Sequence, residues 1–338
     1  MRPALSVFLL ALAAGGAGPA RAAEWHVHVF DAPAHIDALD TLSGEVRVNA
    51  GGLRYKLTLD GGKPAFTFID APAKPALPAG ALPDGHIAVG SHDIARAWLA
   101  EPTPRYDHGI LGDRIEAGSV VIEPRDGAPQ AVRLKPDAVF EDLRPRLADL
   151  DGDGHDEIVV VKSYLKRGSA LAVIAARKGR YSIVAETPPL GAPHRWLDPV
   201  GVADFNGDGK TDIALVRQPH VVGMLELWSW IDGRLQKADE IGDVANHIAG
   251  TRAIGMSAVA DFDGDGLADI AIPSLDRKRL RVIGFVPKAH ELFSVPLPAA
   301  ATTDIALIAR PKPATLALAL GLANGRLALV QRAPPPAP

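Results

Sequence analysis

The stretch VADFNGDGKTDIALV, residues 202–216, places four oxygen-bearing side chains within nine residues: Asp204, Asn206, Asp208 and Asp212. Its flanks are rich in Val, Ala, Ile and Leu, which is typical of buried β-strands. Carboxylates this close together repel one another, and Lys210 is the only basic residue inside the run. The stretch therefore predicts a strand, an acidic loop and a second strand, with the loop being either a solvated turn or a cation site.

The same pattern occurs three times. LADLDGDGHDEIVVV begins its acidic run at Asp149, the second copy begins at Asp204, and VADFDGDGLADIAIP begins at Asp261, so the copies are 55 and 57 residues apart. Each copy is followed by a segment that reads as a hairpin, which makes a unit of four antiparallel strands. Four-stranded sheets repeated at this period are typical of propeller blades.

The rest of the chain also favours β-structure. Of 338 residues, 33 are Gly and 29 are Pro, and 47% are hydrophobic, as expected of a globular protein with many turns. The only segment with a helical pattern is SHDIARAWLAE at 91–101, with Ser91 or Asp93 as a candidate N-cap. Six hairpin turns are expected, near Gly61, Gly127, Gly179, Gly233, Ala289 and Gly325.

We therefore predict an all-β fold: a single β-propeller domain over residues 23–332. The hairpin count favours six blades, and seven remain an alternative if the N-terminal third holds an irregular blade. The strand EWHVHVF (24–30) is expected to complete the sheet of the last blade and so remove a free edge.

The three loops resemble the calcium loops of FG-GAP/VCBS repeats, which are found in integrin-alpha-like β-propellers. The resemblance is clearest over residues 144–310, and no segment before residue 144 carries a full acidic loop. It implies a propeller with calcium sites, used in adhesion, in scaffolding or in accessory parts of enzymes. It further implies that the backbone carbonyls of His155, Lys210 and Leu267 complete the three metal shells.

The loop residues themselves point to calcium. Oxygen ligands recur at positions 1, 3, 5 and 9 of each loop: Asp149, Asp151, Asp153 and Glu157; Asp204, Asn206, Asp208 and Asp212; Asp261, Asp263, Asp265 and Asp269. Oxygen-only ligands suit a hard, flexible cation, so we expect up to three Ca²⁺ ions. An EF-hand does not fit, because its position-12 glutamate is replaced by Val160, Leu215 and Ile272. Asx-type turns that need no metal remain an alternative.

The ends of the chain indicate export. An apolar run over residues 4–17 and small residues at 20–22 are typical of a signal peptide over residues 1–22, too short to span a membrane. The sequence contains no cysteine, which excludes disulfides and a lipid-bearing cysteine. We expect a soluble periplasmic or extracellular protein that begins near Ala23, and a disordered Pro-rich tail over residues 333–338.

A second candidate site lies on the loops opposite the acidic ones. If the acidic loop joins strands one and two, the other connections of each blade share the opposite face. These connections carry candidate ligand-binding residues: Tyr164, His194, Arg195, Trp196, His220, Asn246, His247 and Arg252. They predict a site for carboxylated or sulfated ligands, with arginines as forked donors and Trp196 as a flat surface for a sugar ring. Ordinary solvated loops are the alternative.

Other patterns in the sequence do not identify a functional site. No GxSxG or HExxH motif occurs, and Glu116, Glu141 and Asp142 have no recognisable partner in the sequence. His26 and His28 alternate along one strand and fit a polar edge face more simply than a metal site. The polar, Gly-rich segment RYDHGILGDRIEAG (105–118) has no evident role.

Two functions remain open from the sequence. The favoured one is an exported calcium-binding propeller that acts as a rigid binding, adhesion or scaffold module for a protein or glycan ligand. The alternative is a calcium-dependent polysaccharide lyase or hydrolase that uses the basic face, although no catalytic residue is identified. We expect no nucleic-acid partner and no membrane span at a net charge of −4.

Overall fold

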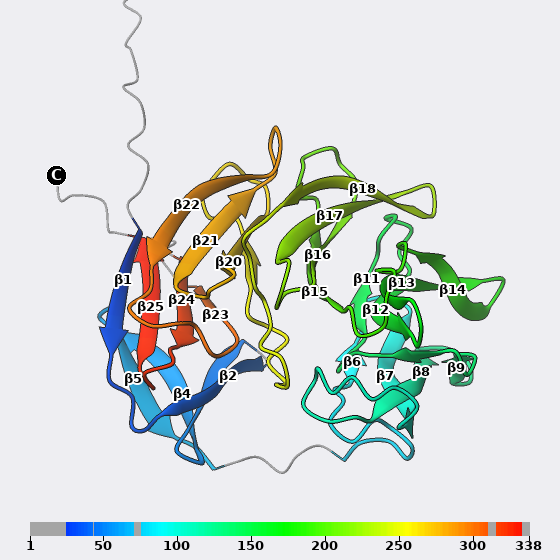
Figure 1. The fold of residues 1–338 in the computed structure, drawn as a ribbon, viewed down its shortest axis with the longest axis horizontal. Coiled ribbons are helices and arrows are strands. Elements are labelled where there is room, and N and C mark those ends of the chain that lie inside the picture. Colours follow the sequence, from blue (N-terminus) through cyan, green and yellow to red (C-terminus); the bar gives the residue numbers. More distant parts are fainter. Residues whose placement is uncertain (1–24, 43, 71–75, 310–315, 333–338) are drawn as a thin grey trace, which may run out of the picture.

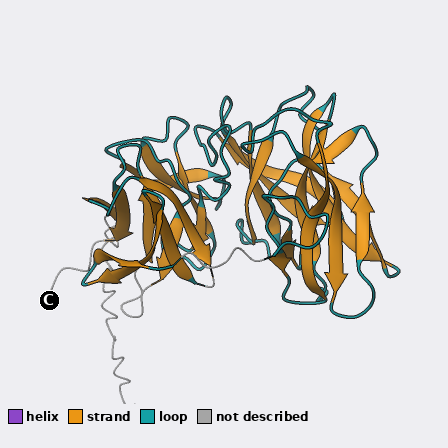
Figure 2. Ribbon diagram, turned by 90° about the horizontal axis from the view of Figure 1, so that it is seen from below, coloured by secondary structure: helices purple, strands orange, loops and turns teal. Residues whose placement is uncertain are grey.

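The computed structural model describes residues 25–42, 44–70, 76–309 and 316–332. The predicted signal peptide and the Pro-rich tail lie outside these residues. Strands and loops make up the described chain, without a helix, as Figure 2 shows. Accordingly, no helix in this part of the chain is long and apolar enough to cross a membrane. The prediction of an all-β fold is confirmed.

The strands form six antiparallel four-stranded units, named here in chain order. Unit 1 contains β2 (Ile36–Leu42), β3 (Glu45–Ala50), β4 (Leu53–Asp60) and β5 (Lys63–Phe68). Unit 2 contains β6 (Ala88–Val89), β7 (Ile94–Thr103), β8 (Glu116–Pro124) and β9 (Gln130–Arg133). Unit 3 contains β11 (Arg146–Ala148), β12 (Glu157–Tyr164), β13 (Gly168–Arg177) and β14 (Arg180–Glu186).

The C-terminal half repeats this arrangement. Unit 4 contains β15 (Leu197–Ala203), β16 (Asp212–Arg217), β17 (Met224–Ile231) and β18 (Arg234–Ile241). Unit 5 contains β19 (Ala258–Ala260), β20 (Asp269–Pro273), β21 (Arg279–Gly284) and β22 (His290–Pro296). Unit 6 contains β23 (Ala306–Ala309), β24 (Leu316–Gly321), β25 (Leu327–Arg332) and β1 (Trp25–Phe30). Each of the six predicted hairpin turns joins two paired strands, as expected.

The N-terminal strand closes the last unit. β1 pairs with β25 in antiparallel register, from Trp25 opposite Arg332 to Phe30 opposite Leu327. The ring of Trp25 also stacks on Phe293 of unit 5, with 4.9 Å between ring centroids. The prediction that this strand completes the last sheet is therefore confirmed.

Two features differ from the sequence predictions. The segment 91–101 is not helical: most of it belongs to β7, where Ala97, Trp98 and Leu99 are all buried. Neighbouring residues buried on both faces suit a strand inside a sheet, so tertiary burial overrides the helical pattern. In addition, β10 (Ala138–Phe140) pairs with both β8 and β12 and joins units 2 and 3 into one nine-stranded sheet.

The units pack side by side in an arc (Figure 1). Separate hydrophobic clusters join unit 2 to unit 3, unit 3 to unit 4, unit 4 to unit 5, unit 5 to unit 6, and unit 6 to unit 1. Within the described residues, no such cluster joins unit 1 to unit 2, although these two follow each other in the chain. Units 1 and 2 therefore form the two ends of the arc.

Candidate functional site

The three acidic loops occupy equivalent places in units 3, 4 and 5. Each joins the first strand of its unit to the second, and its position-9 acid is the first residue of that second strand. The first loop runs from β11 to β12, the second from β15 to β16, and the third from β19 to β20. The predicted connection is therefore confirmed for all three copies.

The loops also share one pattern of hydrogen bonds. In the first loop the carboxylate of Asp149 accepts from the backbone N–H groups of Gly152 and Gly154, at 2.7 and 2.9 Å. The Glu157 carboxylate accepts from the N–H of Leu150 at 2.9 Å. The second loop has the equivalent hydrogen bonds to the carboxylates of Asp204 and Asp212. The third loop has them to the carboxylates of Asp261 and Asp269.

This pattern depends on glycine at positions 4 and 6. The six glycines there have φ between +73° and +92°, a region that residues with a Cβ atom avoid. The turns they form bring the N–H groups of positions 4 and 6 onto the position-1 carboxylate. The spacing DxDGDG, with Asn at position 3 of the second copy, is thus required by the local backbone as well as by any ligand.

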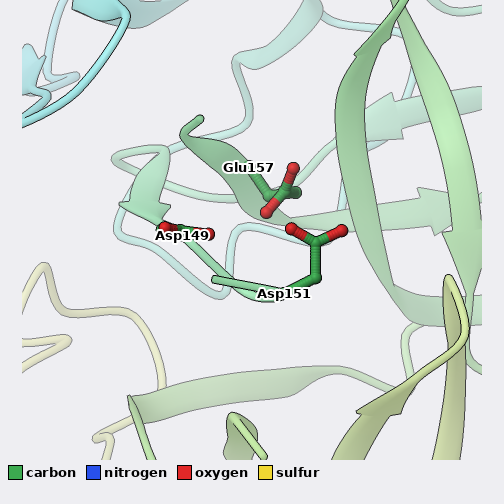
Figure 3. A group of neighbouring side chains, drawn as sticks. All are labelled: Asp149, Asp151 and Glu157. Carbon is green, nitrogen blue, oxygen red and sulfur yellow. The ribbon is translucent and has the colours of Figure 1, made fainter. Parts of the chain in front are cut away.

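Two of the loops bring three carboxylates close enough to share one ion. Oxygen atoms of Asp149, Asp151 and Glu157 lie within 4.8 Å of one another, and so do those of Asp261, Asp263 and Asp265. Figure 3 shows the first group, with the three side chains turned toward a common space. Calcium holds its oxygen ligands at 2.3–2.6 Å, so oxygens up to about 5 Å apart can share one ion. The donor atoms and their spacing fit calcium.

The position-9 acids are buried beneath the loops. Burial, followed by the nearby carboxylates of the same loop, raises the pKa of Glu157 to about 7 and that of Asp269 to about 6. Burial also raises the pKa of Asp212. Each loop therefore holds its carboxylates close together although their negative charges repel one another.

A cavity of about 690 Å³ adjoins the first loop, between units 2 and 3. Asp153 and Glu157 lie in its wall together with His92, His155 and Tyr181. Two imidazoles are held there by carboxylates: His92 Nδ1 lies 3.0 Å from Asp156 Oδ1, and His155 Nδ1 lies 3.1 Å from Asp93 Oδ2. These pairs were missed in the sequence because their members lie on different units, more than 60 residues apart.

The predicted ligand-binding residues on the opposite loops do not all reach the surface. Trp196, Asn246 and His247 are 3%, 0% and 1% exposed, so they cannot take a ligand directly. The expectation that Trp196 offers a flat surface to a sugar ring is wrong. Its ring packs against the rings of His220 and His247, and its Nε1–H donates to the backbone carbonyl of Glu141.

Three other predicted ligand-binding side chains, those of Arg195, Arg252 and Tyr164, form hydrogen bonds within the protein. Arg252 donates to Asp84 and Asp113, at 2.9 and 2.8 Å, and Arg195 donates to a backbone carbonyl. Tyr164 donates its hydroxyl to Glu186 at 2.6 Å, with the Arg167 guanidinium over its ring. The structure thus brings Trp196, His220 and His247 into contact, and places neither arginine in that group.

The segment 105–118 supplies residues that the sequence did not assign. His108 donates from Nδ1 to Glu141 Oε1 at 2.6 Å, and its ring stacks on that of His194 with 5.0 Å between centroids. The Tyr106 hydroxyl accepts the backbone N–H of His194 at 2.8 Å. The only signal in the sequence was the unusual polar composition of this connection.

Comparison with known proteins identifies the repeats. Residues 149–215 and 204–272 match a family model described as FG-GAP-like repeat, and these segments contain all three acidic loops. Residues 149–272 therefore contain FG-GAP-like repeats, as the sequence predicts for this part of the chain. A search of curated proteins gave no match.

A search of solved structures matched, among others, three rhamnogalacturonan lyases. The lyase PL11 of Bacillus licheniformis is 14% identical, with a TM-score of 0.45 over 86% of this chain and 66% of that chain. Lyase YesW is 15% identical (TM-score 0.41; 89% and 60% covered), and the exotype lyase YesX is 14% identical (0.42; 84% and 57%). The chain thus spans between 57% and 66% of the length of these lyases.

Proposed function

We propose that this chain is an exported calcium-binding β-propeller that acts as a rigid binding module for a glycan or protein ligand. The observation that carries the proposal is the repeated loop. The same hydrogen-bonded acidic loop occurs at the same place in three consecutive units, and two of the three loops bring three carboxylates within 4.8 Å. Solvated turns that bind no ion would not be expected to repeat the same arrangement of carboxylates in three consecutive units.

The propeller interpretation rests on how the units pack. Each of the six units has four antiparallel strands, and five separate clusters of buried side chains join the units in order from unit 2 to unit 6 and then to unit 1. Pairing of β1 with β25 completes unit 6 from the opposite end of the chain. In this interpretation the six units are blades, and the opening lies between units 1 and 2.

The calcium ions would be held by positions 1, 3, 5 and 9 of each loop. Bound calcium supplies positive charge that offsets the repulsion among the loop carboxylates. The loop backbone then needs only its glycine turns and the position-9 acid to keep its shape. Calcium in this role is structural: each ion fixes the acidic loop between the first two strands of its own unit.

The proposal is tested by thermal denaturation of the purified protein in calcium, in magnesium and in chelator. A ligand that binds only the folded state adds about 2.7 kcal/mol per site at a hundredfold excess over its Kd. We expect a clear rise in Tm with calcium and a smaller one with magnesium, which demands stricter octahedral geometry. Equal Tm values in calcium and chelator would overturn the calcium sites and leave the Asx-turn alternative.

A second candidate function is a calcium-dependent polysaccharide lyase or hydrolase. It is favoured by the cavity of about 690 Å³, whose wall holds two carboxylate-bound imidazoles next to the first acidic loop. Incubation with a panel of acidic and neutral polysaccharides separates the two functions. A lyase generates unsaturated, ultraviolet-absorbing ends, a hydrolase generates reducing ends, and a binding module generates neither.

A further inference from the structure

The first acidic loop forms hydrogen bonds with the unit that precedes it in the chain. Its position-8 residue, Asp156, is 2% exposed and reaches the segment 90–94 of unit 2, which leads from β6 into β7. Oδ2 of Asp156 accepts the backbone N–H groups of His92 and Ile94, at 3.0 and 3.4 Å, and Oδ1 lies 3.0 Å from His92 Nδ1. The side chain of Asp156 therefore bonds to unit 2, although its backbone belongs to unit 3.

Unit 2 contributes further contacts to the same residue. Oδ1 of Asp93 accepts the backbone N–H of Asp156 at 2.7 Å, and Oδ2 of Asp93 lies 3.1 Å from His155 Nδ1. Gly90 lies against the carboxyl group of Asp156, so close that a Cβ atom on this glycine would be 2.7 Å from Oδ2. The segment 90–94 thus packs tightly around Asp156.

The second and third loops provide a comparison within the same chain. Position 8 is Thr211 in the second loop and Ala268 in the third, so neither has an acid there. Among the described residues, the hydrogen bonds of these two loops stay within their own units. Position 8 is also outside the set of expected calcium ligands. The buried acid at position 8 of the first loop is therefore explained by its contacts with unit 2.

Asp156 lies between two residues of the calcium loop. Glu157 follows it and supplies one of the three carboxylates whose oxygens lie within 4.8 Å of one another. His155 precedes it and supplies the backbone carbonyl that the resemblance to FG-GAP repeats implies as a ligand. A bound ion would restrict the backbone on both sides of Asp156, whereas repulsion among the loop carboxylates favours looser positions when no ion is bound. Calcium binding at this loop and the order of segment 90–94 are thus physically linked.

The segment 90–94 also forms part of the wall of the cavity of about 690 Å³ between units 2 and 3. His92 and Asp93 line this cavity, and so does Arg125. The Arg125 guanidinium donates to the carbonyl oxygens of His92 and Gly90, at 2.5 and 2.7 Å, and its backbone N–H donates to the carbonyl of Asp93 at 2.8 Å. A displacement of segment 90–94 would therefore move three residues of the cavity wall.

We propose that Asp156 is a positioning residue that couples calcium binding at the first loop to the conformation of segment 90–94, and so to the shape of the cavity between units 2 and 3. The proposal rests on the calcium sites proposed above and gives the first of them a regulatory role. Calcium at the second and third loops does not act on unit 2. The coupling is reciprocal, so disruption of the contacts from the side of unit 2 weakens calcium binding at the first loop.

Hydrogen exchange of the purified protein, followed by mass spectrometry in calcium and in chelator, tests the proposal. If segment 90–94 opens only when the first ion leaves, a hundredfold excess of calcium over its Kd should slow exchange in this segment about a hundredfold. Peptides from β3 and β4 of unit 1 report any general effect of calcium. Asp149→Asn, which weakens the first site, should abolish the protection at the same calcium concentration, and Asp261→Asn, which weakens the third, should retain it.

Variants at position 8 separate the contact with unit 2 from ion binding. Asp156→Ala gives the first loop the residue that the third loop has at this position. At a hundredfold excess over its own Kd, this variant should bind calcium but lose the calcium-dependent protection of segment 90–94. Asp156→Asn keeps the size of the side chain and replaces the alanine variant if that variant does not fold. Thr211→Ala, at the same position of the second loop, should leave the protection unchanged.

Calorimetry measures the reciprocal effect. Asp93→Asn, in unit 2, should weaken calcium binding at the first loop about fivefold or more and leave the other two sites unchanged. Asp126→Asn removes a charge from the same cavity wall and controls for charge alone. Calcium binding at the first loop without slower exchange in segment 90–94, or protection that survives Asp156→Ala, would overturn the coupling and leave the calcium sites intact. Failure of the first loop to bind calcium would overturn both the coupling and the calcium role proposed for this loop.

Discussion

Replacement of His247 by glutamine should change how the stability of the protein depends on pH. His247 is 1% exposed, donates to the carbonyl of Thr251 and accepts from His220. Burial, the largest cause, lowers its pKa from 6.5 to about 4. The folded state therefore binds its proton less readily than the unfolded state does.

The sign and size of the effect follow by linkage. For a histidine whose pKa is depressed on folding, the stabilisation is complete above the unfolded pKa of 6.5 and is lost as the pH falls from 6.5 toward 4. At pH 5, the unfolded chain is mostly protonated at this residue and the folded chain mostly is not. The two pKa values then correspond to a loss of about 2 kcal/mol relative to neutral pH.

Urea unfolding at pH 7 and pH 5, at constant calcium, measures the effect for the wild type and for His247→Gln. Other groups titrate in this range, among them Asp304, whose pKa is raised to about 6 by burial, so the two proteins must be compared at each pH. We expect the stability advantage of the wild type to shrink by about 2 kcal/mol between pH 7 and pH 5. An unchanged difference, or the same shift in the control His290→Gln, would refute the burial argument.

Three other predictions address the loops, the core and the N-terminus. Asn206→Asp should tighten calcium binding at the second loop, measured by calorimetry, because it raises the ligand charge to that of the other two loops; weaker binding would mean that added repulsion dominates. Phe205→Ala should cost about 3–5 kcal/mol in urea unfolding, since this ring is fully buried between units 4 and 5, and a cost under 1 kcal/mol would contradict that packing. Mass spectrometry of exported material should give a chain beginning near Ala23, and material that retains residues 1–22 would contradict the predicted signal peptide.

Local features of this fold could be predicted from the sequence. The acidic loops were found because glycine at positions 4 and 6 and oxygen ligands at odd positions are local requirements of one turn. The hairpins were found for the same reason, since residues such as Gly179 and Gly233 adopt positive φ between two paired strands. The closing strand was also predicted, because a sheet of the last unit would otherwise keep a free edge.

Features that depend on distant residues could not be predicted. The helical pattern of 91–101 gave way to burial on both faces of β7, which only the neighbouring strands determine. Glu141 had no recognisable partner in the sequence, because its partner His108 lies on a long connection from another unit. The basic face was overestimated, because the sequence cannot show that Arg252 is paired with Asp84, 168 residues away.

Counting the bound calcium ions tests the central claim most directly. Chelator-stripped protein is titrated with calcium by calorimetry, together with Asp149→Asn, Asp204→Asn and Asp261→Asn, each of which removes the position-1 charge of one loop. The account predicts three equivalents for the wild type and loss of one equivalent, or marked weakening at one site, in each variant. Absence of calcium binding, or binding that all three variants leave unchanged, would contradict it.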